Sequence, residues 1–184
     1  MKKVMLILTV VAGLFAGSTN AQEKKNPMVG GAPMYANKDI VENAVNSKDH
    51  TTLVAAVKAA GLVETLKSAG PFTVFAPTNK AFDKLPAGIV DGLLKPESKE
   101  TLTKILTYHV VAGKMDSKAI VAAIKAGKGS ASLKTVSGGT LTASLDGAKV
   151  KLTDENGGSA YVTTADVYQS NGVIHVVDGV VLPK

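Results

Sequence analysis

The chain has 184 residues, of which 45% are hydrophobic and 20% charged, a composition typical of a globular protein. It contains no cysteine, which excludes disulfides, thiol nucleophiles and cysteine-ligated metal centres. All 21 basic residues are lysines, so the two-pronged guanidinium contacts that read DNA bases are missing, and we expect no specific nucleic-acid partner.

Residues 1–21 have the pattern of a secretory signal peptide. Lys2 and Lys3 form a basic start, residues 4–16 are nearly all apolar, and small residues up to Ala21 suit a cleavage site. The apolar run is shorter than the roughly 20 residues of a membrane-spanning helix. We therefore expect a secreted or periplasmic protein with no membrane span after cleavage. The mature chain would have 19 basic and 15 acidic residues, a net charge of +4.

The mature chain is predicted to begin with a flexible leader over residues 22–38, because this segment is polar and contains two prolines and a Gly-Gly pair. A single domain over residues 39–184 follows. Its length agrees with the usual domain size of about 100–200 residues.

The first half of the domain is predicted to be mainly helical. Asp39 can cap a short helix, Asp49 or Thr51 can cap a second, and Gly61 suits the left-handed residue that ends it. The segment 72–76 is predicted to be a central strand, because both of its faces are apolar.

Two longer helices complete this half. The first places four side chains on one face by their spacing, namely Leu102, Ile105, Leu106 and His109. Asp116 or Ser117 can cap the second, which is predicted to end at Gly127.

The second half alternates apolar and polar residues, as strands do. Residues 140–145 and 148–152 are joined by Asp146-Gly147, which predicts a hairpin whose two turn residues both have positive φ. Residues 161–167 and 173–182 are predicted to be two further strands. Because helices come first and strands later, the fold class expected is α+β.

Three segments carry a resemblance to a known family: Thr73–Phe82, Ile105–Val111 and Asn171–Pro183. In residue types, order and separation they resemble the fasciclin-like domain family, and the likeness covers residues 39–183. The resemblance implies a wedge of two β-sheets with helices packed along one side. It also implies a non-enzymatic role in adhesion or in contacts with partner proteins or glycans.

The same resemblance suggests candidate contact residues. Tyr108 and His109 match a Tyr-His pair linked to adhesion in animal members, and Asp166 before Val167 matches an Asp-Ile pair, with valine replacing isoleucine. The residues themselves also allow a structural interpretation. His109 continues the apolar stripe of its helix, so it can be a buried histidine with a backbone partner, and Tyr108 can pack against a neighbouring sheet.

The sequence predicts no metal site, no cofactor and no catalytic residues. The three histidines show none of the close spacings typical of zinc ligands, and the G-x-S-x-G motif of serine hydrolases is missing. A pair of carboxylates distant in sequence could still perform hydrolysis, so a hydrolase remains a weaker alternative.

The leading hypothesis is an exported, non-enzymatic interaction module, expected to be a monomer. It would mediate adhesion or contact with the matrix or envelope through a protein or polysaccharide partner. The alternative is a carrier or sensor of a small hydrophobic ligand, bound in a crevice between the helices and the sheet.

Overall fold

The computed structural model describes residues 26–184, and the predicted signal peptide over residues 1–21 lies outside them. The helices are α1 (Ile40–Ala44), α2 (Thr51–Ala60), α3 (Val63–Lys67), α4 (Asn79–Asp83), α5 (Ile89–Leu93), α6 (Lys99–Tyr108) and α7 (Ser117–Ala126). The strands are β1 (Met28–Val29), β2 (Ala32–Pro33), β3 (Phe72–Pro77), β4 (Val110–Ala112), β5 (Ser130–Lys134), β6 (Thr140–Asp146), β7 (Lys149–Thr153), β8 (Ser159–Gln169) and β9 (Gly172–Val177).

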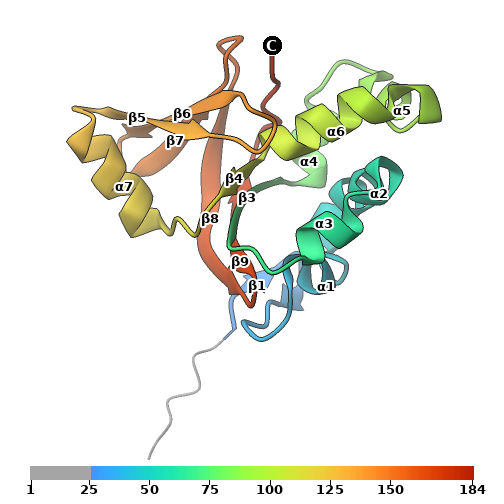
Figure 1. Ribbon diagram of the computed structural model, residues 1–184, viewed down its shortest axis with the longest axis horizontal. Coiled ribbons are helices and arrows are strands. Elements are labelled where there is room, and N and C mark those ends of the chain that lie inside the picture. Colours follow the sequence, from blue (N-terminus) through green and yellow to red (C-terminus); the bar gives the residue numbers. More distant parts are fainter. Residues whose placement is uncertain (1–25) are drawn as a thin grey trace, which may run out of the picture.

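Strands β3 to β9 form one sheet with the order β4-β3-β9-β8-β7-β6-β5, in which only β3 and β9 are parallel. The long strand β8 belongs to both arms, because its residues 159–161 pair with β7 and its residues 162–169 pair with β9. Figure 1 shows β5 to β7 lying across the direction of β8 and β9. The α+β fold class is confirmed, and the two predicted sheets are two arms of one curled sheet.

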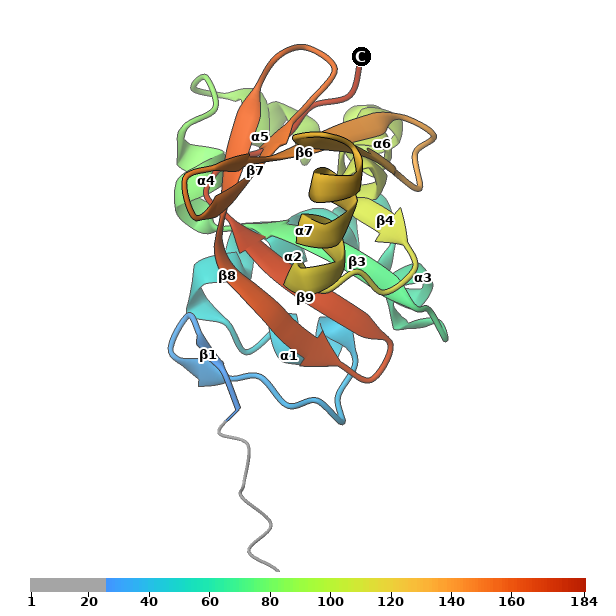
Figure 2. The same cartoon turned by 90° about the vertical axis from the view of Figure 1, so that its left-hand side faces the viewer.

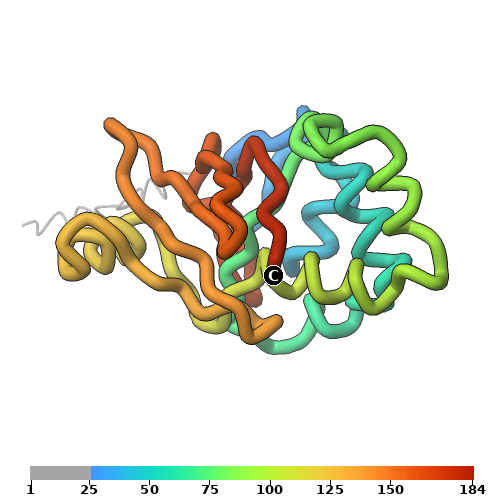
Figure 3. Tube along the Cα trace, turned by 90° about the horizontal axis from the view of Figure 1, so that it is seen from above, coloured from blue at the N-terminus to red at the C-terminus, as the bar shows by residue number. Residues whose placement is uncertain are grey.

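Two hydrophobic cores lie on opposite faces of this sheet. The first fills the space between α1 to α6 and the arm that contains β3 and β9, and it includes Ile40, Leu53 and Val74. The second lies inside the curl beneath α7 and includes Phe75 and Ile120. Figures 2 and 3 show α7 and the strands β5 to β7 on one side of β3 and β9, with the helical layer on the other. Since β3 supplies side chains to both cores, its predicted central position is confirmed.

Most predicted helix ends are confirmed by their caps. Asp39 accepts a hydrogen bond from the backbone of Glu42 and forms a capping box with it, and Asp116 caps α7 by accepting from Ala119. Gly61 ends α2 with a φ of 72°. The cap predicted for α2 at Asp49 or Thr51 is wrong, since the residue before the helix is His50, at the end of a 3-10 turn over Lys48–His50.

The hairpin of β6 and β7 is confirmed, but its turn is placed one residue later than predicted. Asp146 pairs with Lys149, so the turn residues are Gly147 and Ala148, and Gly147 alone has a positive φ, of 59°. Glycine at the first turn position is typical of a type II′ turn. This register sets a carboxylate opposite a lysine across the two strands, which is a favourable pair.

The flexible leader predicted for residues 22–38 is wrong for the part that the structure describes. Strands β1 and β2 form a small hairpin, and Met34 beyond it is 2% exposed in the first core. The hairpin is joined to the 3-10 turn before α2 by a backbone hydrogen bond from the N–H of Lys48 to the carbonyl oxygen of Gly30. The segment is polar in overall composition, but three of its apolar side chains are buried: Val29, Ala32 and Met34.

The substitution Met34→Ala tests whether this hairpin region stabilises the fold. Removing a buried methionine side chain is expected to lower the free energy of unfolding by about 2–5 kcal/mol. Met28→Ala is the matched control, because Met28 is 61% exposed; its effect should stay below about 0.5 kcal/mol. Urea denaturation of both variants measures the difference, and equal effects would contradict the packing described here.

Candidate functional site

Tyr108, the first of the predicted contact residues, is fully buried. Its ring lies in the second core beside the sheet, and its hydroxyl donates to the backbone oxygen of Thr140 at 2.7 Å. The same hydroxyl accepts from the backbone N–H of Glu155 at 3.3 Å. The structural interpretation of Tyr108, packing against a neighbouring sheet, is therefore confirmed.

His109 is buried too, with 2% exposure, and both of its ring nitrogens have backbone partners. Nδ1 lies 2.8 Å from the carbonyl oxygen of Ile105, and Nε2 accepts from the N–H of Val181 at 3.2 Å. This pattern requires a neutral ring with its proton on Nδ1. Burial lowers the pKa of His109 to about 4. Together, Tyr108 and His109 connect α6 to the curl and to the C-terminal segment, and neither offers side-chain surface to a partner.

Asp166, the third candidate, lies at the surface where β8 passes the start of α7. It is half-buried, and its φ of 60° is unusual for a residue other than glycine. Its carboxylate accepts from the N–H of Ser117 at 2.7 Å and from the hydroxyl of Ser117 at 2.5 Å. Asp166 therefore fixes the first turn of α7 to the bend in β8.

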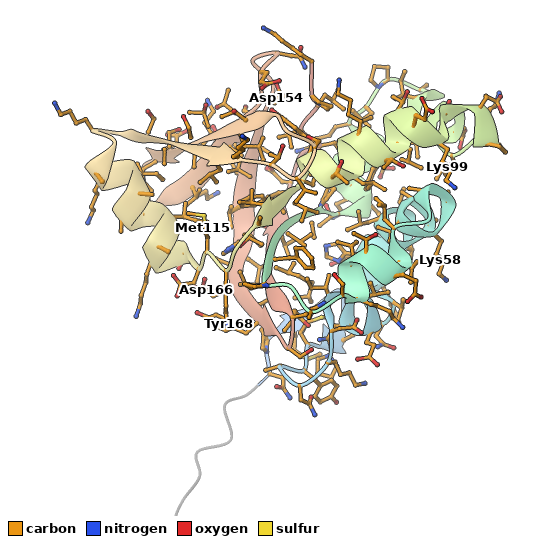
Figure 4. The ribbon with its side chains drawn as sticks, in the orientation of Figure 1. Lys58, Lys99, Met115, Asp154, Asp166 and Tyr168 are labelled. Atoms are coloured by element: carbon orange, nitrogen blue, oxygen red, sulfur yellow. The ribbon has the colours of Figure 1, made fainter. Side chains whose placement is uncertain are left out.

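An exposed aromatic residue stands next to this junction. Tyr168 is 39% exposed, its hydroxyl lies 3.4 Å from Asp116, and the Lys114 ammonium lies 4.9 Å from the centre of its ring. Figure 4 shows Asp166 and Tyr168 together near Met115, on the side of the molecule away from Lys58 and Lys99. We call this surface the α7 corner; its members are Lys114, Asp116, Ser117, Asp166 and Tyr168.

His175 lies directly beneath the α7 corner and is completely buried. Its Nε2 is 2.8 Å from the carbonyl oxygen of Met115, and its Nδ1 accepts from the N–H of Asp166 at 3.4 Å, a long contact. Burial lowers the pKa of His175, so the ring is neutral.

Ser117, Asp166 and His175 thus come close together without forming a catalytic triad. A nucleophilic serine needs a base in contact with its Oγ, with a third group orienting that base. Here the hydroxyl of Ser117 donates to the aspartate, and both histidine nitrogens are occupied by backbone groups. This group of residues therefore serves to position α7.

Within residues 26–184, no three histidine or carboxylate side chains come together in a way that could hold a metal ion. None of the helices in this range has both the length and the apolar character needed to cross a bilayer.

The crevice predicted between helices and sheet is present as an apolar cavity of about 80 Å³ in the first core. Helices α1, α2, α3 and α6 enclose it together with β3 and β9, and its lining includes Ile40, Leu53, Val57, Leu66 and Ile174. It reaches the surface, because the exposed residues Lys58 and Thr65 also line it.

His50 is one of the polar side chains of this lining, which also include Ser47, Thr107 and His109. It is 3% exposed, and its Nδ1 lies 2.8 Å from the hydroxyl of Ser47. Among the described residues, its Nε2 has no hydrogen-bond partner. Burial lowers the pKa of His50; the Ala76 carbonyl acts in the opposite direction but does not complete a hydrogen bond with Nε2. Sequence reasoning considered His50 only as a metal ligand and missed this position.

The pH dependence of stability tests the role of His109. The unfolded histidine takes up a proton below its ordinary pKa of 6.5, whereas the folded one resists protonation until about pH 4. Stability is therefore unaffected above pH 6.5 and falls as the pH drops through this window, by about 3 kcal/mol from His109 alone. Urea denaturation at pH 7 and pH 4 should show this loss in the wild type and a loss smaller by about 3 kcal/mol in His109→Gln. Identical losses would contradict a neutral, buried His109.

Comparisons with known proteins place this geometry in a family. The chain matches the Fasciclin domain over residues 48–183. The protein sll1483 of Synechocystis sp. is 48% identical over 160 residues, which are 87% of this chain and 82% of that protein. The immunogenic protein MPB70 of Mycobacterium bovis is 37% identical over 145 residues, which are 76% of this chain and 66% of that protein.

The fold agrees with a solved structure. A FAS1 domain pair from the insect cell adhesion molecule fasciclin I superimposes with a TM-score of 0.70 and 19% identity, over 79% of this chain and 51% of that one. The matched range contains the second core, the α7 corner and the first core except for its members before residue 48, such as Met34 and Ile40. The chain belongs to the fasciclin domain family.

Proposed function

We propose that this chain is an exported, non-enzymatic interaction module that mediates adhesion or contact with the envelope or matrix. Its partner would be a protein or a polysaccharide outside the cytoplasm, and the module would act as a secreted or periplasmic monomer. The proposal is supported by the family and by the similarity of the fold to domains of a cell adhesion molecule. The α7 corner is the observation that carries it.

The α7 corner has the composition of a contact surface. Tyrosine is enriched among the residues that dominate binding energy in interfaces, because it buries a large area and still offers a hydroxyl. Tyr168 is exposed beside a lysine and two carboxylates, so it can meet either a polar polymer or a protein. Two independent ties hold the surface in place: the cap of α7 by Asp116 and the anchoring of Ser117 by Asp166.

Backbone strain at the α7 corner supports the same proposal. A residue other than glycine held at positive φ costs free energy and persists only where the surroundings fix it; such residues cluster at functional sites. Asp166 adopts this conformation within an irregularity in the pairing of β8 with β9, between Thr164 and Val167. The bend turns Tyr168 and Asp166 toward the start of α7, which brings the exposed tyrosine and the half-buried aspartate onto one surface (Figure 4).

The test is binding of the mature domain, residues 22–184, to envelope fractions and surface polysaccharide of its own host. Tyr168→Ala is expected to weaken binding about tenfold or more if Tyr168 is a central contact. Tyr35→Ala is the matched control, because Tyr35 is also 39% exposed and also has a lysine ammonium, that of Lys38, 5.0 Å from its ring centre. It should change affinity less than about twofold.

Salt screens the attraction between exposed lysines and a polyanion, over about 10 Å at 0.1 M. Binding through the α7 corner does not depend on that attraction alone, so it should persist at high salt. Equal effects of Tyr168→Ala and Tyr35→Ala would show that the α7 corner is not the contact surface. Loss of all binding at high salt would show that non-specific attraction between the lysines and a polyanion accounts for the interaction. Variants of Tyr108 or His109 are unsuitable probes, because both side chains are buried and their removal would damage the fold.

The cavity favours a second candidate function, the carriage of a small hydrophobic molecule. Ligand sites are typically concave, mostly apolar and provided with a few polar groups, as this cavity is. Mass spectrometry of organic extracts from the purified protein tests it. A molecule that co-purifies in stoichiometric amount and is lost in Val57→Phe, which fills the cavity, would support carriage.

A further inference from the structure

We infer that the cavity binds a neutral, mainly apolar molecule with a single hydroxyl group, which hydrogen-bonds to Nε2 of His50. The inference rests on the second candidate function and is independent of adhesion through the α7 corner.

The lining of the cavity excludes a charged ligand. Aliphatic side chains such as Leu53, Val57 and Leu66 make up most of it, and an ion moved from water into such surroundings loses its hydration without compensation. The one cationic side chain in the lining, Lys58, is exposed at the edge. A carboxylate would therefore stay at the surface, and only a neutral body would enter.

His50 supplies the polar recognition. A buried nitrogen without a hydrogen bond costs free energy, and a ligand that pairs with it recovers that cost on binding. The contact of Nδ1 with Ser47 allows two arrangements of the ring proton, so Nε2 either donates or accepts. A ligand hydroxyl can do both, whereas a carbonyl can only accept. The hydroxyl is thus the group that suits either form of His50.

The size of the cavity favours a narrow ligand. An engineered cavity of about 150 Å³ accommodates benzene, whereas this one has about 80 Å³. The enclosed space is therefore about half as large, so a ligand of this size must extend partly out of the cavity. A linear aliphatic chain can lie with its hydroxyl at His50 and continue between α2 and α3 toward Thr65 and Lys58, where the cavity reaches the surface.

The experiment titrates the mature domain with 1-hexanol, n-hexane and hexanoate, followed by NMR. Saturable shifts are expected for 1-hexanol in residues that line the cavity, together with a shift of the His50 Nε2 resonance. Hexanoate should leave the His50 Nε2 resonance unshifted, because its carboxylate stays at the surface and cannot reach His50. Because hexane and hexanol differ in their own hydration, the informative quantity is the ratio of their affinities in wild type and in His50→Phe. That ratio should fall roughly 3- to 10-fold in the variant, the effect of one hydrogen bond.

Val57→Phe provides the test of location, with Val150→Ile in the second core as its control. Val57→Phe should abolish the shifts from both neutral probes, and Val150→Ile should leave them unchanged. An unchanged affinity ratio in His50→Phe would overturn the assignment of the hydroxyl to His50 while leaving carriage intact. No binding of any probe, up to its solubility, would overturn this inference and the carrier function together. Neither outcome bears on the proposal of adhesion through the α7 corner.

Discussion

The parallel pairing of β3 with β9 is the contact on which the rest of the structure depends. It joins segments about one hundred residues apart, from Phe72 opposite Gly172 to Pro77 opposite Val177. Helices cover one face of this pair and the curled arm covers the other, so both cores are built on two short strands. Because every side chain of β9 is buried, each polar group there must find a partner within the protein.

The three histidines show how this requirement is met. His109 and His175 have backbone partners for both nitrogens. His109 joins the end of α6 to Val181 in the C-terminal segment, and His175 joins β9 to Met115 and to Asp166 in β8. His50 lies in equally apolar surroundings, but only one of its nitrogens is satisfied by the described residues. In a domain held together by its cores alone, such an unpaired group is the exception that points to a ligand.

Sequence reasoning succeeded where the determinants are local. The caps at Asp39 and Asp116, the end of α2 at Gly61 and the two-faced strand β3 all follow from side chains within a few residues of each other. The α+β class follows from the order of these elements.

Sequence reasoning failed where contacts between residues distant in the chain determine the local structure. Strands β4 and β5 are short and went unpredicted, and the strand expected over residues 173–182 ends at Val177. The hairpin of β1 and β2 forms because Met34 finds a core built by residues far along the chain. For the candidate site, a motif could propose Tyr108, His109 and Asp166, but only the fold distinguishes the two interior residues from the one at the surface. Tyr168 and His50 acquire their roles solely from neighbours that the fold supplies.

The positions of the two ends of the described chain have a mechanical consequence. The described chain enters beside β1 at one end of the molecule, and Lys184 lies at the opposite end (Figures 1 and 2). Tension applied between these ends would act along β8 and β9, so it would load their ladder in shear, with many hydrogen bonds resisting at once. The last residues are also fixed to the domain, since the N–H of Val181 donates to His109 and the N–H of Leu182 donates to Asp154. A domain whose described ends lie at opposite sides of such a ladder is suited to resist a force applied between them.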